Sequence, residues 1–139
     1  MKLNFFIATG LFVAFLIVFT MLACTNDELP LPESPAYCDT ISITTYDNGI
    51  HAIINDGCAY SGCHDGAGGI GPGNFNSYAG ILSYLSNGEF RNRVITAQND
   101  PALGMPPNQS VYPESRSDEL PEEDFRAIFC WLNAGYPEN

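Results

Sequence analysis

The fold to expect depends most on residues 58–64, which read Cys58-Ala59-Tyr60-Ser61-Gly62-Cys63-His64. This stretch has the closest grouping of reactive side chains in the chain. Two thiols with four residues between them are followed at once by an imidazole, and both types of side chain are strong metal ligands. Three interpretations need no large cofactor: a local disulfide, half of a zinc site, or a chance arrangement among five cysteines. Zinc needs a tetrahedral set, and the other candidate ligands of the domain are scattered singly, at Cys38, His51 and Cys130.

Helical patterns surround this stretch, and each lies between a capping candidate and a glycine. The three apolar stripes are Ile50/Ile53/Ile54, Tyr78/Ile81/Leu82/Leu85 and Phe125/Ile128/Phe129/Leu132. The expected helix starts are Asp47 or Asn48, Ser77 and Pro121, and the expected ends are Gly57, Gly88 and Gly135. A further short helical turn is expected over residues 90–95.

The fold class predicted from these patterns is all-α, since no alternating strand pattern is longer than residues 41–45. Two loops, over residues 66–76 and 97–120, are too long to be plain connections in so small a domain. All ten prolines and twelve of the thirteen glycines follow residue 24. The domain therefore has few apolar side chains for a core, and we expect a staple, a metal or a cofactor to stabilise it.

The N-terminal segment predicts export from the cytoplasm. Lys2 precedes an uncharged apolar run over residues 3–23, which is typical of a signal peptide and is also long enough for a membrane anchor. Leu22-Ala23-Cys24 resembles the lipobox of bacterial lipoproteins, although Met21 stands where leucine is usual. This resemblance implies a signal peptide over 1–23, lipidation of Cys24, and a membrane-tethered protein on the periplasmic or cell-surface side. Residues 24–37 then form an extended linker, and the domain spans 38–139.

The charge of the chain excludes one class of partner. After residue 24 the chain has four arginines, no lysine and all sixteen of its carboxylates. Nucleic acid would be repelled, because phosphate binding depends on Lys and Arg. We expect a protein partner with a basic docking surface, and an association that slows as salt rises.

Cys58, Cys63 and His64 resemble the attachment site of c-type cytochromes, where two thiols add to the haem vinyl groups and the histidine binds iron. The histidine follows the second cysteine directly, so the second thioether holds the imidazole beneath the iron. Two residues usually separate the cysteines, and the four found here match a longer loop of some cytochromes c.

The resemblance extends over residues 50–135, which are similar to small cytochrome c domains of the planctomycete type. The shared features are the first helix, the Cys-Cys-His site, Phe75 with Ser77-Tyr78, Met105-Pro106-Pro107, and a last helix ending Trp131-Leu132-Asn133-Ala134-Gly135. The resemblance implies a small cytochrome c-like fold of three to four short helices, with long Gly/Pro-rich loops around one covalent haem c. It further implies His64 and Met105 as axial ligands and electron transfer, rather than catalysis, as the function.

Met105 is also the only methionine after the signal segment. It lies in a Gly/Pro-rich loop rather than on an apolar stripe, which favours a ligand over a core residue. His51 is the alternative sixth ligand.

The resemblance also concerns residues around the iron ligands. Gly71-Pro72 is similar to the Gly-Pro of many cytochromes c, whose backbone carbonyl accepts the proximal imidazole N–H; the alternative is an ordinary turn. Arg91 and Arg93 are candidates for pairing with haem propionates or are simply solvated. Trp131 is expected to pack against the haem edge or the first helix.

Two cysteines remain after these assignments, Cys38 and Cys130. In an oxidising compartment we expect them to form a disulfide that closes a loop of about 90 residues and contributes roughly 4 kcal/mol. The predicted function is a membrane-tethered monohaem electron carrier. The alternatives are a haem enzyme or gas sensor, which needs an open iron site, and a non-haem binding module stapled by disulfides or zinc.

Overall fold

The computed structural model describes residues 34–42 and 45–139, and places residues 34–139 in one compact unit. Its described residues contain no strand, and Asp65 and Asn74 form only an isolated antiparallel bridge. The α-helices of this part are α2 (His51–Gly57), α3 (Tyr78–Ser86), α4 (Glu89–Arg91) and α5 (Glu122–Asn133). Irregular helical turns are η1 (Ala36–Thr40), η2 (Tyr46–Ile50) and η3 (Asn92–Thr96). The predicted all-α class is confirmed for these residues.

The helices α3 and α5 begin where the sequence predicted. The Ser77 hydroxyl accepts the backbone N–H of Gly80 at 3.2 Å, which caps α3. Pro121 precedes α5, whose first turn carries three acidic side chains that complement the helix dipole. The expected turn at 90–95 is also present, as α4 followed by η3.

The start of the first helix differs from the prediction. Asp47 and Asn48 do not cap α2, because both lie inside η2, where Gly49 turns the chain with φ 108°. A side chain rarely tolerates this φ, which glycine adopts freely. The cap belongs to Thr45, whose side chain accepts the Asn48 backbone N–H at 3.1 Å. The regular helix therefore begins only at His51.

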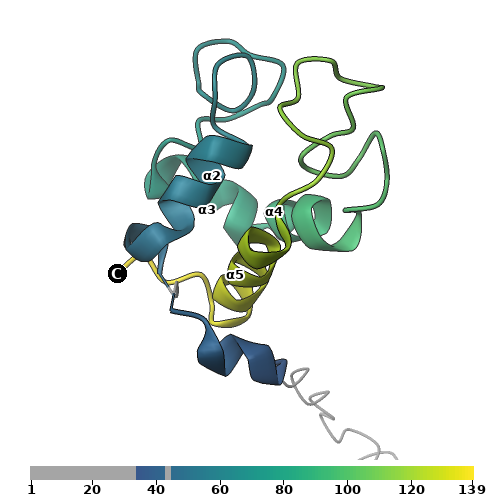
Figure 1. Cartoon of the computed structure of the whole chain (residues 1–139). Coiled ribbons are helices and arrows are strands. Elements are labelled where there is room, and N and C mark those ends of the chain that lie inside the picture. Colours follow the sequence, from purple (N-terminus) through teal and green to yellow (C-terminus); the bar gives the residue numbers. More distant parts are fainter. Residues whose placement is uncertain (1–33, 43–44) are drawn as a thin grey trace, which may run out of the picture. The chain divides into compact units, whose positions relative to one another are not determined.

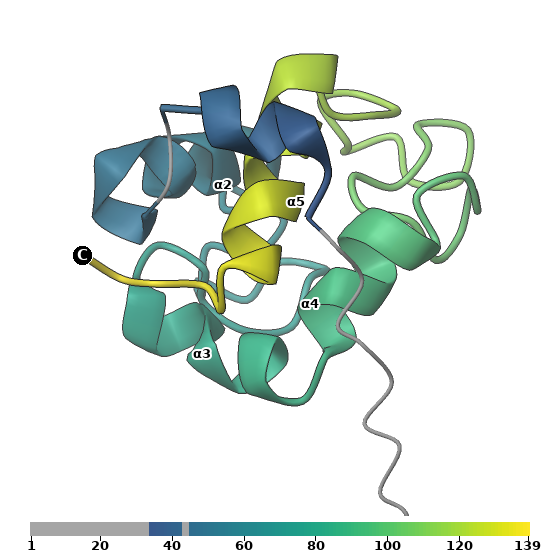
Figure 2. The ribbon, with the colours of Figure 1, turned by 90° about the horizontal axis from the view of Figure 1, so that it is seen from below.

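The core is formed around α5, which in Figure 2 has α2 and α3 on one side and α4 on the other, and which lies below these three helices in Figure 1. Trp131 is fully buried, and its indole N–H donates to the carbonyl of Pro137 at 2.9 Å. Its ring packs against those of Tyr46, Phe90 and Tyr136. Trp131 is therefore a core residue, with ring contacts to η2, α4 and the segment after α5. The other fully buried large side chains are Ile50, Ile54, Ile81, Val94 and Ile128.

The N-terminal part of the unit is tied to α5. Cys38 in η1 forms a disulfide with Cys130, as expected, across a sequence separation of 92 and with the two Cα atoms 5.4 Å apart. Tyr37, just before Cys38, also packs against α5. Its ring lies 6.3 Å from that of Phe129 and 5.2 Å from the Arg126 guanidinium.

The expected signal peptide at 1–23, the lipidation site Cys24 and most of the linker 24–37 lie outside the described residues. Within residues 34–42 and 45–139, no helix is both long and apolar enough to cross a membrane.

Candidate functional site

A cavity of about 260 Å³ lies between the two long loops that the sequence singled out. Both loops extend to the end of the domain opposite η1 (Figure 1). Cys58, Cys63, His64 and Met105 all line this cavity, although 41 positions separate the histidine from the methionine. The remaining walls are mostly aromatic and aliphatic, with contributions from Phe75, Tyr84, Phe90 and Val94. The structure therefore brings the four predicted cofactor-binding residues to one apolar site.

The two thiols are presented by a loop that folds back on the end of α2. The backbone N–H of Cys58 donates to the Ile54 carbonyl at 2.8 Å, and the backbone N–H of His64 donates to the Cys58 carbonyl at 3.1 Å. Cys58 is buried, and burial raises the pKa of its thiol to about 12. Cys63 is partly exposed. Both are free thiols, so the structure does not contain the local disulfide that was one alternative.

The imidazole of His64 is fixed from three sides. Its Nδ1 lies 2.7 Å from the carbonyl oxygen of Pro72, and its ring stacks parallel on Phe75 with 4.2 Å between ring centres. Gly71 covers the ring so closely that a Cβ at this position would lie 2.7 Å from ring atoms. The hydrogen bond at Pro72 is the one that the Gly-Pro resemblance predicted.

The hydrogen bond determines which ring nitrogen of His64 is available to a metal. A carbonyl oxygen can only accept, so Nδ1 carries the proton and Nε2 keeps its lone pair. Burial lowers the pKa of His64, which favours this neutral form. A neutral imidazole anchored through Nδ1–H is the usual form of a histidine ligand.

Met105 is supplied by the second loop. Its backbone N–H donates to the carbonyl of Arg93 at 3.1 Å, and Pro106 and Pro107 follow it along the same cavity wall. The side chain is partly buried and packs against the core. The thioether is therefore available to the cavity on a segment attached to η3.

The other candidates are divided between the cavity and the rest of the domain. Arg93 lines the cavity, whereas the Arg91 guanidinium donates to Asn133 at 2.7 Å and is absent from the lining. His51 lies outside the lining, with Nε2 3.2 Å from the carbonyl of Asn76. The structure thus does not bring His51 or Arg91 to the four central residues.

Several lining residues were not identified from the sequence, among them Tyr60 and Glu89. Tyr60 is buried between the two cysteines, and Glu89 pairs with Arg93 at 2.7 Å. Tyr60 could have been noticed in the sequence as an aromatic residue inside the short segment between the two cysteines. The spacing of Glu89 and Arg93, four residues apart, was an available signal for the ion pair.

Few ligands remain for a zinc site. Cys38 and Cys130 are consumed by their disulfide. In residues 34–42 and 45–139 there is no group of three or more His, Cys, Asp or Glu side chains placed to hold a metal ion.

The chemistry of the cavity residues fits a covalently attached haem. They offer one imidazole nitrogen, one thioether, two thiols and apolar walls, which are the groups that haem c uses in proteins. The cavity volume of about 260 Å³ is just below the range of about 300–1,000 Å³ typical for ligand pockets.

Comparisons with known proteins identify no relative of the chain. No family model matches it, and neither the curated proteins nor the solved structures contain a match.

Proposed function

We propose that residues 34–139 form a monohaem c-type cytochrome domain that carries single electrons. The observation that supports this most strongly is the state of His64. A neutral imidazole, held through Nδ1 by Pro72, leaves Nε2 available in the same apolar cavity as Met105 and two free thiols.

Each residue has a separate role in this proposal. Cys58 and Cys63 would hold the porphyrin through thioether bonds, and His64 and Met105 would be the axial ligands. When bound, haem supplies a one-electron iron couple whose potential depends on its ligands and on burial. The apolar walls exclude water, and the contacts from Phe75, Gly71 and Pro72 orient the imidazole.

Two protein ligands favour an electron carrier over an enzyme or a gas sensor. If His64 and Met105 both bound the iron, it would have no open position for a substrate. The folded unit carries four arginines and thirteen carboxylates, so its partner should present a basic surface. We further propose that the N-terminal segment and Cys24 tether this carrier outside the cytoplasm.

Met105→Ala in the matured full chain tests the function. We expect the reduced wild-type protein to exclude carbon monoxide without denaturant, and the variant to bind it. We also expect a lower reduction potential for the variant, because thioether ligation raises the potential. Binding of carbon monoxide to the wild type would favour a sensor or enzyme. Equal reduction potentials of the wild type and the variant would show that Met105 does not bind the iron. Absence of haem after expression with maturation factors would favour a non-haem module.

A further inference from the structure

The position of Met105 depends on contacts that a single residue, Arg93, makes with the loop. The Arg93 guanidinium donates through Nη1 to the carbonyl of Leu103 at 3.2 Å. The backbone carbonyl of the same residue accepts the N–H of Met105 at 3.1 Å. Arg93 therefore binds the segment at Leu103 and again at Met105.

The segment between these two contacts is itself fixed. The Asp100 carboxylate accepts the backbone N–H groups of Ala102 and Leu103, both at 2.9 Å. The backbone N–H of Gly104 donates to the Asp100 carbonyl at 2.8 Å. Because this turn is closed by its own hydrogen bonds, a displacement at Leu103 is transmitted to Met105 rather than absorbed between them.

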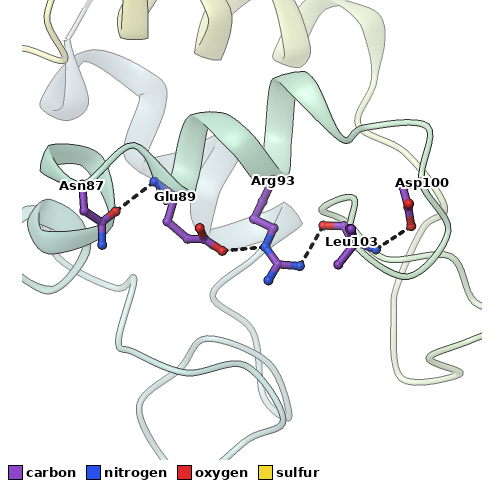
Figure 3. Close-up of polar contacts among 5 residues, drawn as sticks. All are labelled: Asn87, Glu89, Arg93, Asp100 and Leu103. Atoms are coloured by element: carbon purple, nitrogen blue, oxygen red, sulfur yellow. Dashed lines mark hydrogen bonds and ion pairs between the residues drawn. The ribbon is translucent and has the colours of Figure 1, made fainter.

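Glu89 aims the guanidinium at the loop. Its Oε1 accepts from Arg93 Nε at 2.7 Å, and its backbone N–H donates to the Asn87 side chain at 2.9 Å. Figure 3 shows the resulting chain of contacts from Asn87 through Glu89 and Arg93 to Leu103 and Asp100. The chain connects the start of α4 with the loop that carries Met105.

The ion pair is too exposed to contribute much to the stability of the fold. The Arg93 and Glu89 side chains are 34% and 44% exposed, and pairs of this kind are worth little in folding free energy. The ion pair thus adds little to the stability of the fold, but it orients the guanidinium that contacts the loop at Leu103, so its effect on the loop is one of position.

We propose that Arg93, oriented by Glu89, is the positioning residue that holds Met105 in the cavity. This inference rests on the proposed function, in which Met105 is an axial ligand, and it assigns Arg93 a role other than pairing with a propionate. Without the guanidinium the loop would keep its backbone bond to Arg93 but lose the contact at Leu103, so the thioether would be held less firmly and the iron of a bound haem would be more accessible to external ligands.

Arg126 provides a matched control. It pairs with Glu122 four residues earlier, at the same 2.7 Å, but on α5, and neither side chain lines the cavity. The experiment compares Arg93→Leu, Arg93→Lys and Arg126→Leu in the matured full chain. The readouts are the sulfur-to-iron charge-transfer absorption, the reduction potential, and the binding of carbon monoxide to the reduced protein.

We expect Arg93→Leu to shift the equilibrium between bound and dissociated thioether by about tenfold, the equivalent of one hydrogen bond to a charged group. It should lower the potential and admit carbon monoxide, with haem attachment unchanged. Lysine keeps one donor without the fork, so Arg93→Lys should restore part of the absorption. Arg126→Leu should match the wild type. If Arg93→Leu also matches the wild type in all three readouts, the proposal is overturned.

A second measurement separates this inference from the proposed function. In the full chain made without haem, amide hydrogen exchange at Met105 reports the hold on the loop directly. Arg93→Leu should accelerate that exchange by about tenfold relative to Arg126→Leu. If exchange is accelerated but the chain never binds haem, the proposed cytochrome function fails, while the role of Arg93 in holding the loop stands. Unchanged exchange would overturn the role of Arg93 in either case.

Discussion

The guanidinium of Arg116 lies over the ring of Tyr60, 4.0 Å from its centre, and the Arg116 backbone N–H donates to the Tyr60 hydroxyl at 3.0 Å. Tyr60 belongs to the four-residue spacer between Cys58 and Cys63, and Arg116 to the loop that carries Met105. Arg116 also contacts Asp56, at 3.3 Å from its carbonyl. The longer spacer thus supplies the residue that joins the two walls of the cavity.

Removal of the Tyr60 hydroxyl should loosen this connection. Tyr60→Phe keeps the ring and leaves the Arg116 N–H without its acceptor, at a cost of about 1 kcal/mol in unfolding free energy. Tyr60→Leu also removes the cation–π contact, for about 0.5–1 kcal/mol more. Urea unfolding of the disulfide-intact chain measures both. Two variants as stable as the wild type would show that Tyr60 does not join the walls.

Gly71→Ala should displace the imidazole. The added Cβ would lie 2.7 Å from the His64 ring, which is held on its other face by Phe75. We expect a loss of about 1–3 kcal/mol in stability and a reduced yield of low-spin haem protein after maturation.

Gly68→Ala is the control for this substitution. Gly68 has φ +90°, so alanine adds backbone strain, but its Cβ would meet no atom within 4 Å. Loss of low-spin haem in Gly68→Ala to the same extent would mean that the loop, and not the contact with His64, is responsible.

The two cavity thiols should differ in reactivity before haem is attached. Burial raises the pKa of Cys58 to about 12, so it has almost no thiolate at about pH 8, while Cys63 is partly exposed. We expect iodoacetamide to modify Cys63 first in the haem-free chain, with peptide mass spectrometry as the readout. In urea the difference should vanish. Faster modification of Cys58 under native conditions would contradict the buried position of this thiol.

The disulfide should stabilise the domain without being part of the cavity. Closing a loop over a separation of 92 residues is worth roughly 4–5 kcal/mol on the chain-entropy model. We expect Cys38→Ala/Cys130→Ala to lower the unfolding free energy by that order, with the haem spectrum of the folded fraction unchanged. A variant that is folded but lacks the sulfur-to-iron absorption would show that the disulfide also shapes the cavity.

The sequence predicted the elements whose signals are local. Ser77 and Pro121 start helices as expected, since a cap acts within a few residues of itself. The cap at Thr45 was missed because the positive φ of Gly49 delays the helix, and a glycine in the sequence permits such a φ without requiring it. The contact of Tyr37 with α5 was missed because it joins residues far apart in sequence.

The candidate site was predictable as residue types but not as contacts. Cys58, Cys63, His64 and Met105, which share one cavity, were predicted from their chemistry and from the resemblance to c-type cytochromes. The hydrogen bond to the Pro72 carbonyl was predicted from the Gly-Pro pair. The positions of Arg91 and Arg93, two residues apart, could not be distinguished. They point to Asn133 and to Glu89 respectively, and only the packing of α4 and η3 against the rest of the domain decides this.

The covalent attachment of haem is the central claim, and the intact mass of the matured chain tests it most directly, together with its pyridine haemochrome spectrum. We predict a mass that exceeds the chain, with any lipid on Cys24, by one haem, and the spectrum of two thioether bonds. The Cys58→Ala/Cys63→Ala variant should lose the covalent group. A colourless wild-type protein, with a mass equal to its chain and lipid alone, would contradict the account.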